Sequence, residues 1–203
     1  MKAVGDLMKN NRFVIRILIF LCIAAVPIAA IAYNRYKDNV YPYQYAKEYF
    51  EQNEDRFSDI ALYFADIGIE NIRTAYMRDY GYLEILMYNS GFEKIDVYSD
   101  SGFQAYKALR DEYDSDPDNT GYQEYMLGYV DAEYEKDGDV FVSIPVYVRE
   151  LEWDGDVDAP NKVLYYIAYY DEGYELDSSL LYFSEKYAVA ENWFVYSRSS
   201  GVG

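Results

Sequence analysis

One stretch of the chain has residue types and spacing that match a metal-binding pattern. Asp114, Asp116 and Asp118 alternate with other residues and Asn119 follows, which gives D-x-D-x-D-N, the beginning of an EF-hand calcium loop. Such oxygen ligands suit Ca²⁺, a hard cation. The pattern then departs from the EF-hand, because Asn119 stands at the glycine position and Tyr125 at the position of the final glutamate. The three aspartates are therefore a calcium candidate, with an ordinary acidic surface loop as the alternative.

The other acidic residues give weaker evidence for a metal or catalytic site. Asp154, Asp156 and Asp158 repeat the same spacing, but no further ligand follows them. A carboxylate pair of the glycosidase type needs a defined separation. In a chain with 36 acidic residues some pair is always available, so the sequence alone cannot identify one.

Several classes of enzyme are excluded by composition. The chain has no histidine, and its single cysteine, Cys22, lies within an apolar run. Ser-His-Asp and Cys-His triads, HExxH zinc sites and histidine general bases are therefore absent. The glycine-rich phosphate loops and the GxSxG nucleophile elbow are also missing. We expect a protein that is not an enzyme and has no cofactor apart from the calcium candidate.

A long apolar run near the N-terminus predicts a membrane anchor. Residues 13–33 contain 21 residues with one charge, Arg16, and a helix of roughly 20 apolar residues crosses a bilayer. Basic residues precede the run, which favours a cytoplasmic N-terminal segment over 1–12. Residues 34–41 then form a stalk, and the domain at 42–198 lies outside the cytoplasm. The alternative is a secretory signal that is cleaved after Ala32, because Ala30-Ile31-Ala32 has the required A-x-A form.

The domain beyond the anchor is acidic and rich in tyrosine. Residues 1–38 hold six of the 18 basic and two of the 36 acidic residues, so the remainder holds 12 and 34, a net charge of −22. This charge repels nucleic acid and favours a basic partner. The 27 tyrosines argue against disorder, since disordered acidic segments contain few aromatic residues. Tyrosine suits both half-buried sheet positions and protein-binding surfaces.

Apolar spacing predicts helices in the first part of this domain. Between residues 43 and 66 apolar side chains recur at intervals of three and four, which indicates an amphipathic helix ended by Gly68. The same spacing suggests a second helix over 69–89, although 82–88 could be a strand. A short third helix is expected over 103–113, with Tyr106 and Leu109 facing inward.

Alternating and continuous apolar runs predict strands in the second part. We expect strands at 92–98, 122–134, 140–148, 163–170 and 192–198, and a flexible tail at 199–203. Asp137-Gly138 indicates a hairpin turn, and Pro145 indicates a sheet edge or a bulge. The predicted fold class is α+β, with a transmembrane helix followed by two or three helices packed on one face of an antiparallel sheet.

These features indicate a membrane-anchored extracytoplasmic binding module, with a basic protein as its expected partner. An inhibitor or immunity protein that masks a basic toxin surface is one specific form of this hypothesis. The alternative is a structural subunit of a cell-envelope or secretion assembly. An enzyme that uses carboxylates or a divalent cation ranks below both.

Overall fold

The computed structural model describes residues 20, 22, 25–67, 72–87, 92–117, 126–135, 137–151 and 162–200. The chain divides into two compact units, residues 1–41 and 42–203. In the first unit residues 25–39 are helical. No helix within the described residues is both long and apolar enough to cross a membrane. Residues 13–19, 21, 23 and 24 of the predicted span lie outside the described residues.

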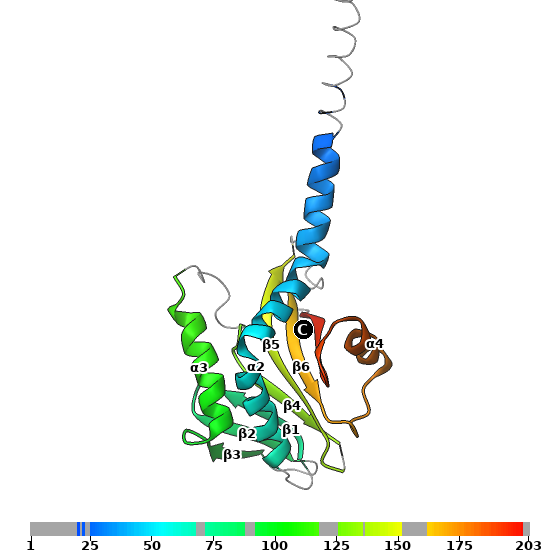
Figure 1. Ribbon diagram of the computed structural model, residues 1–203. Coiled ribbons are helices and arrows are strands. Elements are labelled where there is room, and N and C mark those ends of the chain that lie inside the picture. The colour runs from blue at the N-terminus through cyan, green and yellow to red at the C-terminus, as the bar shows by residue number, and fades with distance from the viewer. Residues whose placement is uncertain are drawn as a thin grey trace, which may run out of the picture. The chain divides into compact units, whose positions relative to one another are not determined.

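The second unit is built on an antiparallel sheet of eight strands, in the order β3-β2-β1-β4-β5-β6-β8-β7 (Figure 1). Together with the helices packed on it, this sheet confirms the predicted α+β class. The strands are β1 (Ile72–Arg78), β2 (Tyr82–Met87), β3 (Phe92–Asp96), β4 (Val130–Tyr134), β5 (Val140–Glu150), β6 (Lys162–Tyr170), β7 (Ala188–Ala190) and β8 (Trp193–Ser200).

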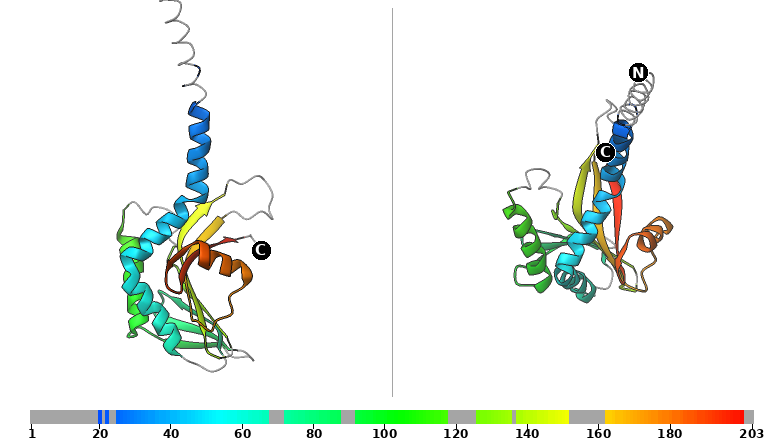
Figure 2. Two further views of the ribbon diagram at one scale, coloured as in Figure 1. Left: turned by 45° about the vertical axis from the view of Figure 1, so that its right-hand side comes forward. Right: turned by 45° about the horizontal axis from the view of Figure 1, so that its top comes forward.

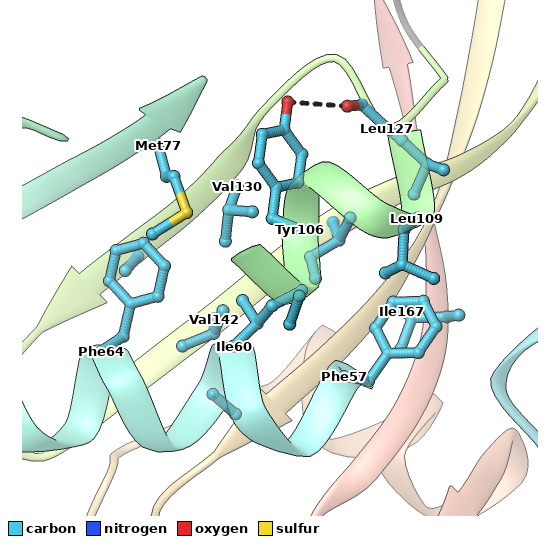
Figure 3. Close-up of a cluster of buried hydrophobic side chains, with 14 of the residues drawn as sticks. Phe57, Ile60, Phe64, Met77, Tyr106, Leu109, Leu127, Val130, Val142 and Ile167 are labelled. Carbon is cyan, nitrogen blue, oxygen red and sulfur yellow. Dashed lines mark hydrogen bonds between the residues drawn. The ribbon is translucent and has the colours of Figure 1, made fainter. Parts of the chain in front are cut away.

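Two helices cover the first face of the sheet, α2 (Tyr41–Ile67) and α3 (Ser101–Ser115). Both were predicted from their apolar spacing. Phe57 and Ile60 of α2 pack with Tyr106 and Leu109 of α3, and all four side chains are completely buried (Figure 3). Each large apolar side chain buried in this way stabilises the fold by about 1.5–3 kcal/mol.

A third helix, α4 (Ser178–Lys186), packs on the second face of the sheet. Its Leu180 and Phe183 contact a separate apolar cluster that contains Phe141, Tyr166 and Phe194. Figure 2 shows α2 and α3 on one side of the sheet and α4 on the other. The expectation that all helices share one face was therefore wrong. The buried strands β5, β6 and β8 carry apolar residues on both faces, so each face needs its own cover.

The predicted helix over 69–89 was also wrong, because the chain forms the β1–β2 hairpin there. The alternative prediction of a strand over 82–88 is confirmed, since β2 occupies Tyr82–Met87. The buried side chains alternate, Ala75 and Met77 in β1 and Leu83 and Ile85 in β2, which is the period of a strand. Gly81 reverses the chain with a φ of +79°. The expected strand over 92–98 is present as β3, which pairs with β2.

Pro145 lies in the central strand β5 and not at a sheet edge, and it marks a bulge. Pro145 pairs with Tyr166, but the next paired residue is Tyr147, which faces Tyr165. The extra residue, Val146, is buried in the core between the sheet and α2. The bulge also frees the carbonyl of Pro145, which accepts a hydrogen bond of 2.7 Å from the Leu127 amide.

The remaining strand predictions hold with changed ends. The 137–138 turn joins β4 to β5, with Gly138 at a φ of +93°. The strand expected from residue 122 begins at Val130 within the described residues. Ser199 and Ser200 extend β8 and are not part of a tail, and residues 201–203 lie outside the description. β6 is buried on both faces, as its continuous apolar sequence indicated.

Candidate functional site

The calcium candidate lies at the end of α3. Asp114 is in the last turn of this helix and accepts a hydrogen bond of 3.0 Å from Nε of Arg110. Asp116 caps the helix, and Asp118 lies outside the described residues. No group of three metal-ligating side chains converges within the described ranges. Calcium binding here stays a prediction. The second aspartate series, at 154–158, also lies outside the described residues.

A polar cleft of about 400 Å³ lies where α2 bends. The backbone of Asn53 leaves the helical region, with φ −131° and ψ 21°. Its side chain bonds back to the preceding turn, because Nδ2 donates to the carbonyl of Tyr49 at 3.0 Å. The side chain of Arg56 donates to both Asn53 and Glu112. The cleft is lined by Glu51, Gln52, Asn53, Glu54, Asp55, Arg56 and Glu112.

A second acidic site lies on the second face of the sheet, in the middle of β4. Val130, Ala132 and Tyr134 point into the main core, so Asp131 and Glu133 point to the opposite face. Asp131 pairs with Tyr76 on the neighbouring strand β1 and with Ser143 on the neighbouring strand β5. Neither carboxylate takes part in an ion pair within the part of the chain that the structure describes. The phenol of Tyr174 donates to Glu133 at 3.4 Å.

The pKa of the Asp131 carboxyl group is raised above its ordinary value. Burial, followed by the negative charge of Glu133, raises the pKa of Asp131 to about 6, and Arg198 opposes this increase. One carboxylate oxygen, Oδ1, is buried and has no hydrogen-bond partner among the described residues. A carboxylate with an unmet acceptor in a half-buried position favours a cation or a hydrogen-bond donor beside it. A positively charged group beside Asp131 would therefore stabilise its ionised carboxylate.

Tyrosines surround this carboxylate pair. The hydroxyl oxygens of Tyr129 and Tyr166 lie 2.9 Å apart, and the Tyr166 ring stacks on Tyr196 at 5.0 Å. Ser143, which is 3% exposed, hydrogen-bonds to Tyr196. Burial and the charges of Asp131 and Glu133 raise the pKa of Tyr76. These phenols stay neutral at physiological pH and supply polar tips at the edge of an apolar cluster.

The same face continues over β1, β2 and β3 without a covering helix from the described residues. Leu86 pairs with Phe92 across β2 and β3, and these side chains are 39% and 57% exposed. Thr74 of β1 pairs with Leu86 of β2 on one side and with Glu133 of β4 on the other. The register thus places Glu133 in one row with the exposed apolar pair. Asp131 lies in the next row, with Tyr76, Glu84 and Lys94.

Sequence reasoning missed Asp131 and Glu133. The signal was available in Val130-Asp131-Ala132-Glu133-Tyr134, where acidic residues alternate with residues that a strand buries. Trp193 belongs to the core, because it is 7% exposed and packs on Phe50. The stripe of α2 is likewise core.

The chain matches no protein family, no curated protein and no solved structure.

Proposed function

We propose that this protein is a membrane-anchored binding module whose extracytoplasmic domain recognises a basic protein. The observation that carries the proposal is a large acidic excess on a well-packed domain. Residues 42–198 hold 12 basic and 34 acidic residues. Their described part has an extensive apolar core, so the charge is displayed on a fixed surface.

The arrangement of the charges supports recognition of a basic protein. Among the described ion pairs, Lys47, Lys107 and Arg110 each bind a carboxylate one helical turn away. Such pairs neutralise local charge and leave most carboxylates open to solvent. Complementary charge raises the rate of association and selects against acidic competitors.

The proposed location of the protein in the membrane follows from residues 13–33. The apolar run holds the chain in a cytoplasmic membrane, and the basic residues before it keep 1–12 on the cytoplasmic side. The acidic domain then meets its partner on the outer side. An inhibitor or immunity protein that masks a basic toxin surface is the specific role that this charge suits best.

The test uses the full chain, tagged at its C-terminus and captured from native membranes in mild detergent. Bound proteins are eluted with a gradient of NaCl and identified by mass spectrometry. We expect a basic protein that leaves the column as salt rises, because exposed charges are screened within about 8 Å at physiological ionic strength. Salt-independent retention, or retention of acidic proteins only, would contradict the proposal.

A further inference from the structure

The second face of the sheet has a covered half and an open half. α4 and the segment before it cover β5, β6 and β8, where Phe141, Tyr166 and Phe194 form the second apolar cluster. In Figure 1, α4 lies beside the red strand β8 and away from β1, β2 and β3. We call the other part the open half-face; it comprises Thr74, Tyr76, Tyr82, Glu84, Leu86, Phe92, Lys94, Asp131 and Glu133.

The open half-face combines the two properties that concentrate binding energy. Leu86 and Phe92 are exposed apolar neighbours, so covering them removes apolar surface from water. Asp131 and Glu133 lie in half-buried positions, where electrostatic attraction is stronger than at a fully solvated surface. Hot spots usually join an apolar anchor to a desolvated polar contact.

The charge of the open half-face indicates a cationic occupant. On β3, the Nζ of Lys94 lies 3.6 Å from Glu84 and 3.2 Å from the Tyr82 hydroxyl. On β8, Arg198 partly offsets the charges of Asp131 and Glu133 but forms no ion pair with either among the described residues. This leaves Asp131 and Glu133 without an ion-pair partner in the described chain. Adding an anion would increase the repulsion that already acts on Asp131, whereas adding an ammonium group would relieve it.

We propose that the open half-face is the docking surface for an extended, lysine-bearing segment of a basic protein. Asp131 and Glu133 accept the lysine ammonium, and Leu86 and Phe92 contact an apolar side chain of the same segment. This inference rests on the proposed function, because it names the surface through which the basic partner is recognised.

The strand register sets the spacing of the segment. Leu86 and Glu133 lie in one row on β2 and β4, with Thr74 of β1 between them. Strands are spaced about 4.8 Å apart, so two spacings separate these positions by about 10 Å. A polyproline II segment advances about 3.1 Å per residue and repeats its face every third residue. An apolar residue followed three positions later by lysine therefore fits both contacts.

The polar cleft at the bend of α2 is the main competitor for a cationic partner. It is richer in carboxylates, but Arg56 already binds Glu112 and Asn53 within it. Its lining residues are all polar, so it offers no apolar anchor. The cleft is therefore a matched control surface, since two of its carboxylates can be neutralised with the same change in net charge.

The first experiment measures binding of a fluorescent peptide with three Leu-Pro-Pro-Lys repeats to the full chain in detergent at fixed ionic strength. Four proteins are compared: wild type, Asp131→Asn with Glu133→Gln, Leu86→Ala with Phe92→Ala, and Glu51→Gln with Asp55→Asn. We expect affinity to fall at least about tenfold for the first double variant, about fivefold for the second, and less than about twofold for the cleft variant. Near-UV circular dichroism verifies that each variant is folded.

An acetyllysine form of the same peptide tests the charge directly, and we expect it to bind at least about tenfold more weakly. Equal losses for the cleft variant and the Asp131/Glu133 variant would overturn the inference, because they would show attraction to net charge alone. Failure of the lysine peptide to bind wild type would also overturn it.

Capture from native membranes with the same variants separates the two proposals. A basic protein retained equally by wild type and by the Asp131→Asn, Glu133→Gln variant would remove the open half-face from recognition and leave the proposed function standing. Retention of no basic protein by any form would contradict the proposed function itself, whatever the peptide result. Loss of the retained protein only in the open half-face variants would support both.

Discussion

The hydroxyl groups of Tyr129 and Tyr166 meet on the second face of the sheet, with their oxygens 2.9 Å apart. Tyr129 precedes β4 and Tyr166 lies in β6, so the contact links strands on either side of β5. Burial and the Tyr129 hydroxyl raise the pKa of Tyr166. The bond therefore connects the covered cluster to the strand that bears Asp131.

Removing one hydroxyl tests how much this contact contributes. Tyr129→Phe leaves the Tyr166 hydroxyl without its partner in a half-buried site, and we expect the free energy of unfolding to fall by about 1 kcal/mol. Urea denaturation of the full chain in detergent, followed by tryptophan fluorescence, measures the change. Tyr80→Phe is the control, because Tyr80 is 59% exposed. Equal effects of the two substitutions would show that the buried hydroxyl pair adds nothing.

The raised pKa of Asp131 predicts stability that depends on pH. The folded chain binds the proton more tightly than the unfolded chain, because the pKa is about 6 in the fold against an ordinary value of 3.8. This contribution to stability is present at low pH and is lost as pH rises through about 6. Asp131→Asn removes the charge, so we expect it to stabilise the protein at pH 7.5 by about 1–3 kcal/mol.

Urea denaturation at pH 4, 6 and 7.5 measures this difference, which should disappear toward pH 4, where Asp131 is protonated in the fold. Asp55→Asn changes the same charge at an exposed position and should show little difference at any pH. An Asp131→Asn variant that is less stable than wild type at pH 7.5 would show that the ionised carboxylate makes a favourable contact.

Gly81 and Gly138 both turn hairpins with a positive φ, but their surroundings differ. A Cβ on Gly81 would lie 1.8 Å from the ring of Tyr98, whereas a Cβ on Gly138 has nothing within 4 Å. Gly138→Ala should destabilise by about 1 kcal/mol through backbone strain alone. Gly81→Ala adds a steric clash and should destabilise by about 3 kcal/mol or more.

Thermal unfolding of the two glycine variants, followed by far-UV circular dichroism, makes the comparison. The order of the melting temperatures is the essential result: wild type highest, then Gly138→Ala, then Gly81→Ala. Equal losses would mean that the Tyr98 ring moves aside without penalty.

Phe57 and Leu62 lie on the same helix and differ in exposure, at 0% and 57%. Phe57→Ala leaves a cavity between α2, α3 and the sheet (Figure 3). We expect it to reduce the free energy of unfolding by about 3–5 kcal/mol. Leu62→Ala should change it by no more than about 0.5 kcal/mol. Denaturation with urea tests both, and a large loss for Leu62→Ala would reveal a contact that covers its side chain.

Local pattern was sufficient for the elements whose apolar residues repeat without interruption. Apolar residues three and four apart defined α2, and the uninterrupted run in β6 indicated burial on both faces. The turn at Gly138 followed from Asp-Gly chemistry. In these segments the local preference and the tertiary contacts agree, so the sequence alone was informative.

Pairing between strands that are distant in the sequence determined the remaining features of the fold. Residues 72–87 fit a helical stripe, but they form a hairpin because β4 supplies a third strand for β1. Asp131 becomes half-buried only when Tyr76 and Ser143 are placed on either side of it by sheet register. The sequence by itself determined the acidic charge, the missing histidine and the apolar run at 13–33. The open half-face required long-range strand pairing, because its residues come from four strands and no local spacing relates them.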